Sequence, residues 1–102
     1  MNHIKTKEQL DHLTSLGPTV VKFFAPWCGP CRSMTPVVKE LAEDNPNVIV
    51  VECNIDKASD LASTYGVSAI PSIKFFAKGG SLVNTVTGIA GKSELQSQVD
   101  KL

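Results

Sequence analysis

TVVKFFAPWCGPC, residues Thr19–Cys31, joins two opposite patterns within one short stretch. Residues 19–25 are apolar, β-branched or aromatic nearly throughout, which predicts a strand buried on both faces. Proline and glycine interrupt the run, and apolar residues then recur at helical spacing at Met34, Val37, Val38 and Leu41. The stretch therefore predicts a buried strand that leads directly into a helix, with a cysteine pair at the junction.

The segment before this stretch predicts a short helix. Leu10, Leu13 and Leu16 recur at every third position within residues 6–16, which places them on one face, and Gly17-Pro18 ends the helix. Ile4, further upstream, can add a short first strand.

The segment after it predicts strand, helix, hairpin and helix. A turn at 45–47 leads to a second strand buried on both faces at 48–51, and a short helix follows that Asp56 caps and Gly66 ends. Strands 72–76 and 81–86 form a hairpin joined by 78–80. The last helix follows residues 91–93. The whole order predicts an α/β fold. A strand–helix–strand crossover followed by a hairpin gives a mixed central sheet of four to five strands, flanked on both faces by about four helices.

Length, charge and cysteine count limit the organisation and location. The chain of 102 residues fits one domain, residues 1–102, with a core that needs no metal or structural disulfide. Ten basic residues against ten acidic ones indicate no surface for nucleic acid or an anionic membrane. No apolar run approaches the roughly 18 residues of a membrane span, and the first residues lack the apolar stretch of a signal peptide. Three cysteines, an odd number, argue against a secreted disulfide framework, so we expect a reducing, cytoplasmic location.

Cys28 and Cys31 are separated by Gly29 and Pro30 at the predicted start of a helix. This spacing lets the two sulfurs approach and bond. Cys28 lies where unpaired backbone amides and the helix dipole favour a thiolate, whereas Cys31 lies further in. Gly29 permits the tight turn, and Pro30 fits the first helical turn because it has no amide proton to lose. We predict that Cys28 attacks a target disulfide and that Cys31 resolves the mixed disulfide.

Two other interpretations of the pair remain open. Half of a zinc site would need two further ligands, and Cys53, His3 and His12 form no second paired motif. A purely structural disulfide would close a very short loop and so would constrain the unfolded chain little. Cys53 by itself predicts a buried, inert thiol, and both histidines are expected at the surface.

The motif Trp27-Cys28-Gly29-Pro30-Cys31 resembles the active site of the thioredoxin family, and further matches run along the chain at Pro36, Asn54–Asp56, Ile70-Pro71 and Gly88. The resemblance implies a thioredoxin fold and a protein-disulfide reductase that works by reversible dithiol–disulfide exchange. Pro30 favours the reducing direction, since oxidase and isomerase relatives usually carry a histidine there that stabilises the thiolate.

The same resemblance implies a substrate groove beside the cysteines. Pro71 would follow a cis peptide bond and expose the backbone of Ile70 as an edge for an extended client peptide. Trp27 would supply a flat apolar surface. The opposite wall would consist of Thr87, Gly88 and Ile89. Taken alone, Pro71 also fits the first residue of an ordinary strand, which needs no special role, and Trp27 can also pack in part.

The sequence departs from the family at two charged positions. The family usually carries a buried aspartate six residues before the first cysteine, where this chain has Lys22. It often carries a lysine two residues before the Asn-Ile-Asp match, where this chain has Glu52. We expect the two to form a partly buried pair beneath the disulfide, in which Glu52 assists proton transfer at the resolving thiol and Lys22 lowers its pKa. The alternative is that Lys22 extends to the surface and neither residue takes part.

The resemblance also implies partners. A flavin-containing thioredoxin reductase would return electrons from NADPH to the pair, and the chain itself is expected to bind no cofactor or metal. The family's clients are ribonucleotide reductase, peroxiredoxin and methionine sulfoxide reductase, and we expect the chain to act as a monomer. A second function class is a binding module whose groove docks one partner under control of the dithiol state.

Overall fold

Helices and strands alternate along the chain in the computed structural model, which describes residues 1–102. The elements are, in chain order, α1 (Lys7–Leu16), β1 (Thr19–Phe24), α2 (Gly29–Asp44), β2 (Ile49–Asn54), α3 (Ser59–Thr64), β3 (Ser72–Phe76), β4 (Leu82–Thr87) and α4 (Lys92–Val99). Every helix and strand expected from the apolar spacing is present, except the short first strand at Ile4.

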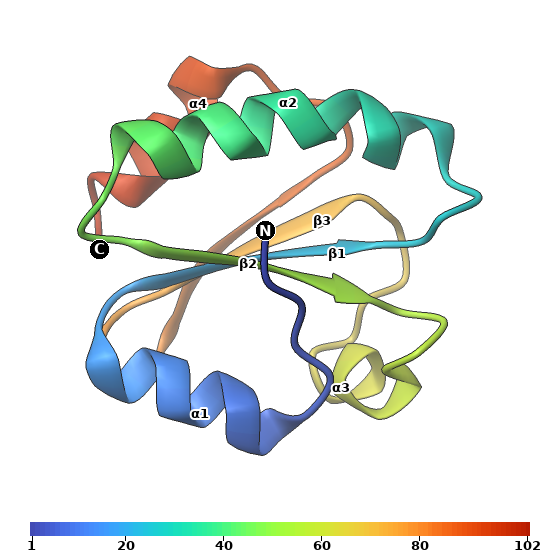
Figure 1. Ribbon diagram of the computed structural model, residues 1–102, viewed down its shortest axis with the longest axis horizontal. Coiled ribbons are helices and arrows are strands. Elements are labelled where there is room, and N and C mark those ends of the chain that lie inside the picture. The colour runs from blue at the N-terminus through green and yellow to red at the C-terminus, as the bar shows by residue number, and fades with distance from the viewer.

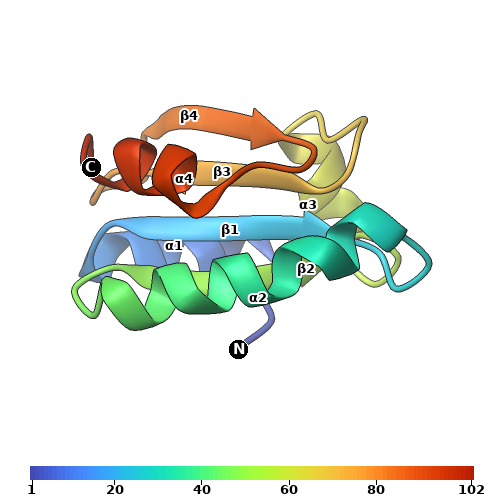
Figure 2. The ribbon, with the colours of Figure 1, turned by 90° about the horizontal axis from the view of Figure 1, so that it is seen from above.

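The strands form one mixed sheet in the order β2-β1-β3-β4. β1 runs parallel to β2 and antiparallel to β3, which pairs antiparallel with β4. α2 and α4 cover one face of the sheet and α1 and α3 the other (Figures 1 and 2). The predicted mixed sheet with helices on both faces is confirmed. β1 lies at its centre, where Val20, Val21 and Phe23 have no exposed surface.

β2 forms one edge of the sheet, and the N-terminal segment runs beside it (Figure 1). The prediction of a strand buried on both faces is only partly right, because an edge strand has a neighbouring strand on one side alone and its first residues stay half-buried. The strand expected at Ile4 is reduced to a single bridge between His3 and Glu52. Two backbone hydrogen bonds hold the bridge, from the Glu52 N–H to Asn2 O and from the Ile4 N–H to Glu52 O, each 2.9 Å long.

α1 buries a different set of residues from the one predicted. Leu10 is buried as expected, but Leu16 is 62% exposed. A step of three residues falls short of the 3.6-residue turn, so Leu16 has rotated away from the face that Leu10 occupies. Thr14 is buried in its place. Its carbonyl accepts a hydrogen bond of 2.8 Å from the Gly79 N–H at the tip of the β3–β4 hairpin.

Asp56 does not cap α3, which corrects the prediction. The helix begins at Ser59, and Ala58 occupies the N-cap position without a side-chain hydrogen bond. The Asp56 carboxylate instead accepts a hydrogen bond of 3.0 Å from the indole of Trp27. Gly66 follows the last turn of α3 with φ of 62°, a conformation that favours glycine.

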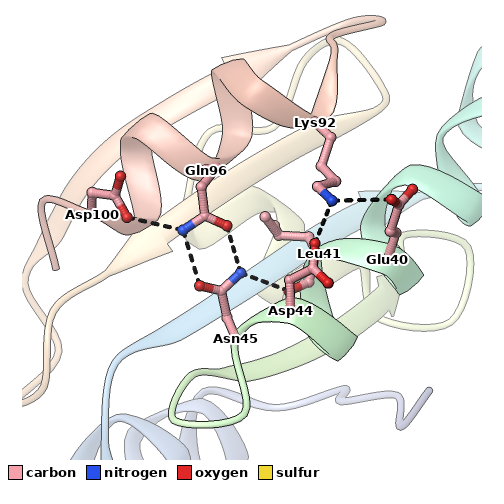
Figure 3. Close-up of polar contacts among 7 residues, drawn as sticks. All are labelled: Glu40, Leu41, Asp44, Asn45, Lys92, Gln96 and Asp100. Atoms are coloured by element: carbon pink, nitrogen blue, oxygen red, sulfur yellow. Dashed lines mark hydrogen bonds and ion pairs between the residues drawn. The ribbon is translucent and has the colours of Figure 1, made fainter.

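Polar side chains fasten α4 to the end of α2 (Figure 3). Asn45 and Gln96 exchange two amide hydrogen bonds, of 2.7 and 3.0 Å. Lys92 pairs with Glu40 at 3.0 Å and also with Asp44. These contacts fix the start of α4, and with it the loop from β4 that passes the candidate site.

Candidate active site

Cys28 and Cys31 form a disulfide at the N-terminus of α2, with their Cα atoms 5.2 Å apart. Cys28 is the N-cap residue, and its sulfur accepts a hydrogen bond of 3.1 Å from the Cys31 N–H. Pro30 lies in the first turn of the helix, where a missing amide proton has no consequence. The strand–helix junction thus places the pair where the sequence predicts it.

The two sulfurs differ in their surroundings. Cys28 keeps 6% of its surface exposed and Cys31 only 1%. The positive end of the α2 dipole and its free amides act on Cys28, because that residue caps the helix. In the reduced state these groups favour a thiolate at Cys28, the form that attacks disulfides.

A free backbone edge lies next to the disulfide. Ile70 packs against the small buried cluster of Ala25, Cys28 and Cys31. A cis peptide bond joins Ile70 to Pro71, as the family resemblance implies. The backbone N–H and C=O of Ile70 make no hydrogen bond within the chain. Such an edge can pair with an extended peptide.

The residues from the end of β4 form the facing wall. Gly88 has φ of 85°, and its N–H donates a 2.8 Å hydrogen bond to the carbonyl of Pro71. That backbone conformation is open to glycine and strained for other residues. Thr87 ends β4 opposite Ser72, and Ile89 beyond it is 69% exposed. The hydrogen bond ties this wall directly to the loop that carries the free edge.

Trp27 gives the site a large apolar surface. Its side chain is 67% exposed, although it precedes a buried cysteine. The hydrogen bond from its indole to Asp56 holds it in place from the loop after β2. Trp27 and Ile89 are exposed apolar groups beside a reactive pair, which is typical of a surface that binds other chains.

Lys22 and Glu52 are direct neighbours across β1 and β2. The Lys22 Nζ lies 3.3 Å from the Glu52 Oε2, and the side chains are 1% and 13% exposed. The alternative in which Lys22 extends to the surface is therefore wrong. The predicted pair is present. The sheet and α2 bury the Lys22 ammonium away from water, and the Glu52 carboxylate compensates its charge.

A pocket of about 280 Å³ connects this pair to the disulfide. Its lining includes Lys22, Cys31, Thr35, Glu52 and His3. The Thr35 hydroxyl accepts a hydrogen bond of 3.0 Å from Lys22 Nζ and lies 3.4 Å from the Cys31 carbonyl, to which it can donate. Sequence reasoning missed Thr35, although its position four residues after Cys31 puts the two on one helix face. It also missed the position of His3 in this pocket, which no local pattern reveals because its contacts come from distant residues.

Cys53 lies apart from the pair as a free, buried thiol. Burial raises its pKa to about 11, so it stays protonated and unreactive near neutral pH. No group of three or more His, Cys, Asp or Glu side chains comes together in an arrangement that could hold a metal ion. None of the helices combines the length and apolar character that crossing a bilayer requires.

Comparisons with known proteins agree with this geometry. The thioredoxin family model matches residues 2–101. The thioredoxin of Chlamydia pneumoniae is 41% identical over 101 residues, 99% of this chain and 98% of the relative. Thioredoxin 1 of Synechococcus elongatus is 44% identical over 90 residues, 87% of this chain and 83% of the relative.

A structural comparison extends the match to the whole fold. Mitochondrial thioredoxin 3 from Saccharomyces cerevisiae, in its oxidized form, superposes with a TM-score of 0.90 at 28% identity. The superposition covers 100% of this chain and 95% of that one. With its cysteine pair bonded at the head of α2, the chain belongs to the thioredoxin family, whose members are protein-disulfide oxidoreductases that act by dithiol–disulfide exchange.

Proposed function

We propose that this chain works in the reducing direction on client proteins, with Cys28 as the attacking sulfur and Cys31 as the resolving one. The observation that carries the proposal is the position of Cys28, which caps α2 next to the unpaired backbone of Ile70. A client strand that pairs with Ile70 brings its disulfide to the more exposed sulfur. Pro30 adds no positive charge that would stabilise the thiolate, which favours the dithiol as an electron donor.

The reaction proceeds in two exchanges. The Cys28 thiolate attacks one sulfur of the client disulfide, which breaks the client's S–S bond, forms a mixed disulfide and releases the other client sulfur as a thiolate. Cys31 then loses its proton and attacks the Cys28 sulfur. The Cys28–Cys31 bond forms, and the second client sulfur leaves as a thiolate. The client gains two electrons, and the pair is oxidised to the disulfide of this structure.

The groove binds a client strand without selecting strongly for the sequence of that strand. Gly29 is the first residue of α2, next to the capping Cys28, and Trp27 offers a flat apolar contact to the client. Thr87, Gly88 and Ile89 close the other side. Contacts through backbone and apolar surfaces favour a broad range of clients, among which we propose ribonucleotide reductase, peroxiredoxin and methionine sulfoxide reductase.

We propose that Glu52 takes the proton from Cys31 in the second exchange while Lys22 stabilises the thiolate that forms. Their shared pocket with Cys31 supports this assignment. In Glu52→Gln the pH–rate profile of turnover should lose the inflection contributed by the carboxylate, whereas an unchanged profile would remove Glu52 from the mechanism.

The proposed electron route starts at NADPH and passes through a flavin-containing thioredoxin reductase, whose cofactors this chain does not itself carry. A cytoplasmic location and a monomer fit this role. Dependence of client reduction on NADPH and a purified reductase is the direct assay of the route.

Reduction of insulin disulfides tests the residue roles. Cys28→Ser should abolish turnover, and Cys31→Ser should abolish it while trapping a covalent mixed disulfide visible on a non-reducing gel. Cys53→Ser is the matched control and should retain wild-type turnover, since its thiol is buried away from the pair. Turnover by Cys28→Ser would disprove the assignment. If the variant lacking both pair sulfurs kept its biological activity, the chain would instead be a binding module.

A further inference from the structure

His3 lines the pocket that Lys22 and Glu52 share with Cys31. The parallel bridge to Glu52 sets its backbone beside that residue, and its ring packs edge-on against Phe24, with centroids 5.4 Å apart. Its side chain is 48% exposed, so the imidazole exchanges protons with solvent while its other side lines the pocket that reaches Cys31.

The two oxygens of Glu52 have different partners. Oε2 lies 3.3 Å from the Lys22 Nζ, and Oε1 lies 3.4 Å from the His3 Nε2. Glu52 therefore stands between the buried Lys22 side chain and the imidazole of His3. Histidine is the ordinary side chain whose change of charge falls near neutral pH.

We propose that His3 is a positioning residue that acts through Glu52 and makes the resolving step respond to pH. The inference rests on the proposed role of Glu52 as the acceptor of the Cys31 proton. With His3 protonated, the Glu52 carboxylate lies between two cations, those of Lys22 and His3, and takes a proton less readily than it does with His3 neutral.

Other charged groups face these residues from the neighbouring elements. Around the pocket they are Lys22 of β1 and Arg32 of α2. Glu52 also shares a neighbouring cavity with the N-terminal residue Met1 and with Lys39 and Glu43 of α2. His12 of α1 is the other histidine, and it lines a separate cavity with His3.

Protonated His3 has a second, opposite effect, because an added positive charge favours a thiolate at Cys31. The effect on Glu52 is the larger one. The His3–Glu52 contact is 3.4 Å, whereas the pocket separates His3 from Cys31, and Coulomb energy falls with distance and with polar surroundings. The resolving step should therefore slow when His3 is protonated.

Stopped-flow reaction of the reduced protein with an aromatic disulfide that releases a coloured thiolate tests the inference. The first release reports the attack by Cys28, and the second reports the displacement by Cys31. Wild type, His3→Gln and His3→Lys are compared from about pH 5.5 to about pH 8, with His12→Gln as the matched control. His3→Gln mimics the neutral ring, and His3→Lys mimics the protonated ring at every pH.

The second release should be about fivefold faster in His3→Gln than in wild type at the acidic end, and equal to wild type at the basic end. In His3→Lys it should be slower than in wild type by a similar factor at the basic end, and equal at the acidic end. His12→Gln should follow wild type throughout. A merely structural role would shift each variant by one factor at every pH, and that result, or identical profiles, would overturn the inference.

The same traces separate this inference from the proposed function. If wild type shows no second release, the assignment of Cys31 as the resolving sulfur fails. If both releases occur and the Glu52→Gln profile equals that of wild type, the role of Glu52 fails and the inference with it. If Glu52→Gln alters the profile and the His3 variants do not, only the inference about His3 is wrong.

Discussion

Lys22 and Lys74 are both buried in the sheet, but only Lys22 has a carboxylate partner. Lys22 is 1% exposed and pairs with Glu52. Lys74 is 6% exposed, and its only partner is the hydroxyl of Thr85, at 3.1 Å. Burial without a compensating negative charge lowers the pKa of Lys74 below its ordinary value of 10.5.

The two lysines also lie on opposite faces of the sheet. Lys22 shares its face with Val20, which packs under α2 and α4, whereas Lys74 shares its face with Phe76, which packs toward α1 and α3. The paired charge therefore lies beside the redox site, and the unpaired one lies away from it. We infer that the pair serves the chemistry, while Lys74 lowers the stability of the fold.

The largest effect is expected from Glu52→Leu, which leaves the Lys22 ammonium buried without its counter-ion. It should lower the free energy of unfolding of the disulfide-bonded protein by about 3 kcal/mol, measured by urea denaturation. The double variant Lys22→Met with Glu52→Leu should recover most of that loss. A single variant as stable as wild type would show that Lys22 does not need its partner.

Thr85→Val is expected to come next, since it removes the only hydrogen bond of Lys74. The free energy of unfolding should fall by about 1.5 kcal/mol, because the donor is charged and remains buried. Thr85→Val in the Lys74→Met background is the control and should have little effect. Equal losses in both backgrounds would mean that the hydroxyl acts independently of Lys74.

Lys74→Met should stabilise the fold, in contrast to Glu52→Leu, which should destabilise it. Methionine has a similar length and no charge to desolvate, so the free energy of unfolding should rise by about 1 kcal/mol at neutral pH. The measurement is the same urea titration. A loss of stability would show that the Thr85 contact already compensates for burial of the ammonium.

The smallest expected effect is the pH dependence of the free energy of unfolding that Lys74→Met adds. The folded-state pKa of Lys74 is lowered, so between that pKa and 10.5 the unfolded chain binds more protons than the folded protein. The free energy of unfolding of wild type therefore rises with pH relative to that of Lys74→Met. Cys53 has the opposite influence, since its pKa is raised from 9.0 to about 11 and its stabilisation is lost at alkaline pH. Both proteins share Cys53, so the difference between them isolates Lys74. The advantage of Lys74→Met should shrink toward pH 10.5, and a constant advantage would contradict the assignment.

Much of the fold follows from local patterns in the chain. The run at 19–25 and the helical spacing from Met34 onward predict β1 and α2, because the period of apolar residues is a property of each segment alone. The errors concern positions that depend on neighbours. Leu16 lies at a helix end turned away from the core, and β2 is half-buried because it is an edge strand. Asp56 contacts Trp27, a residue far away in sequence, and not the helix that follows it.

The sequence by itself determined the cysteine pair at a strand–helix junction, the proline that follows the free backbone edge, and the exchanged charges at Lys22 and Glu52. The pair is readable from residue type and short spacing, whereas the proline and the exchanged charges are readable from the resemblance to the family. Only the tertiary structure decided which charges meet. Strand register sets Lys22 against Glu52, the N-terminal bridge brings His3 to the same carboxylate, and Lys74 is left with a hydroxyl alone. The physical reason is that side-chain partners across a sheet are fixed by pairing between distant segments, which no local pattern encodes.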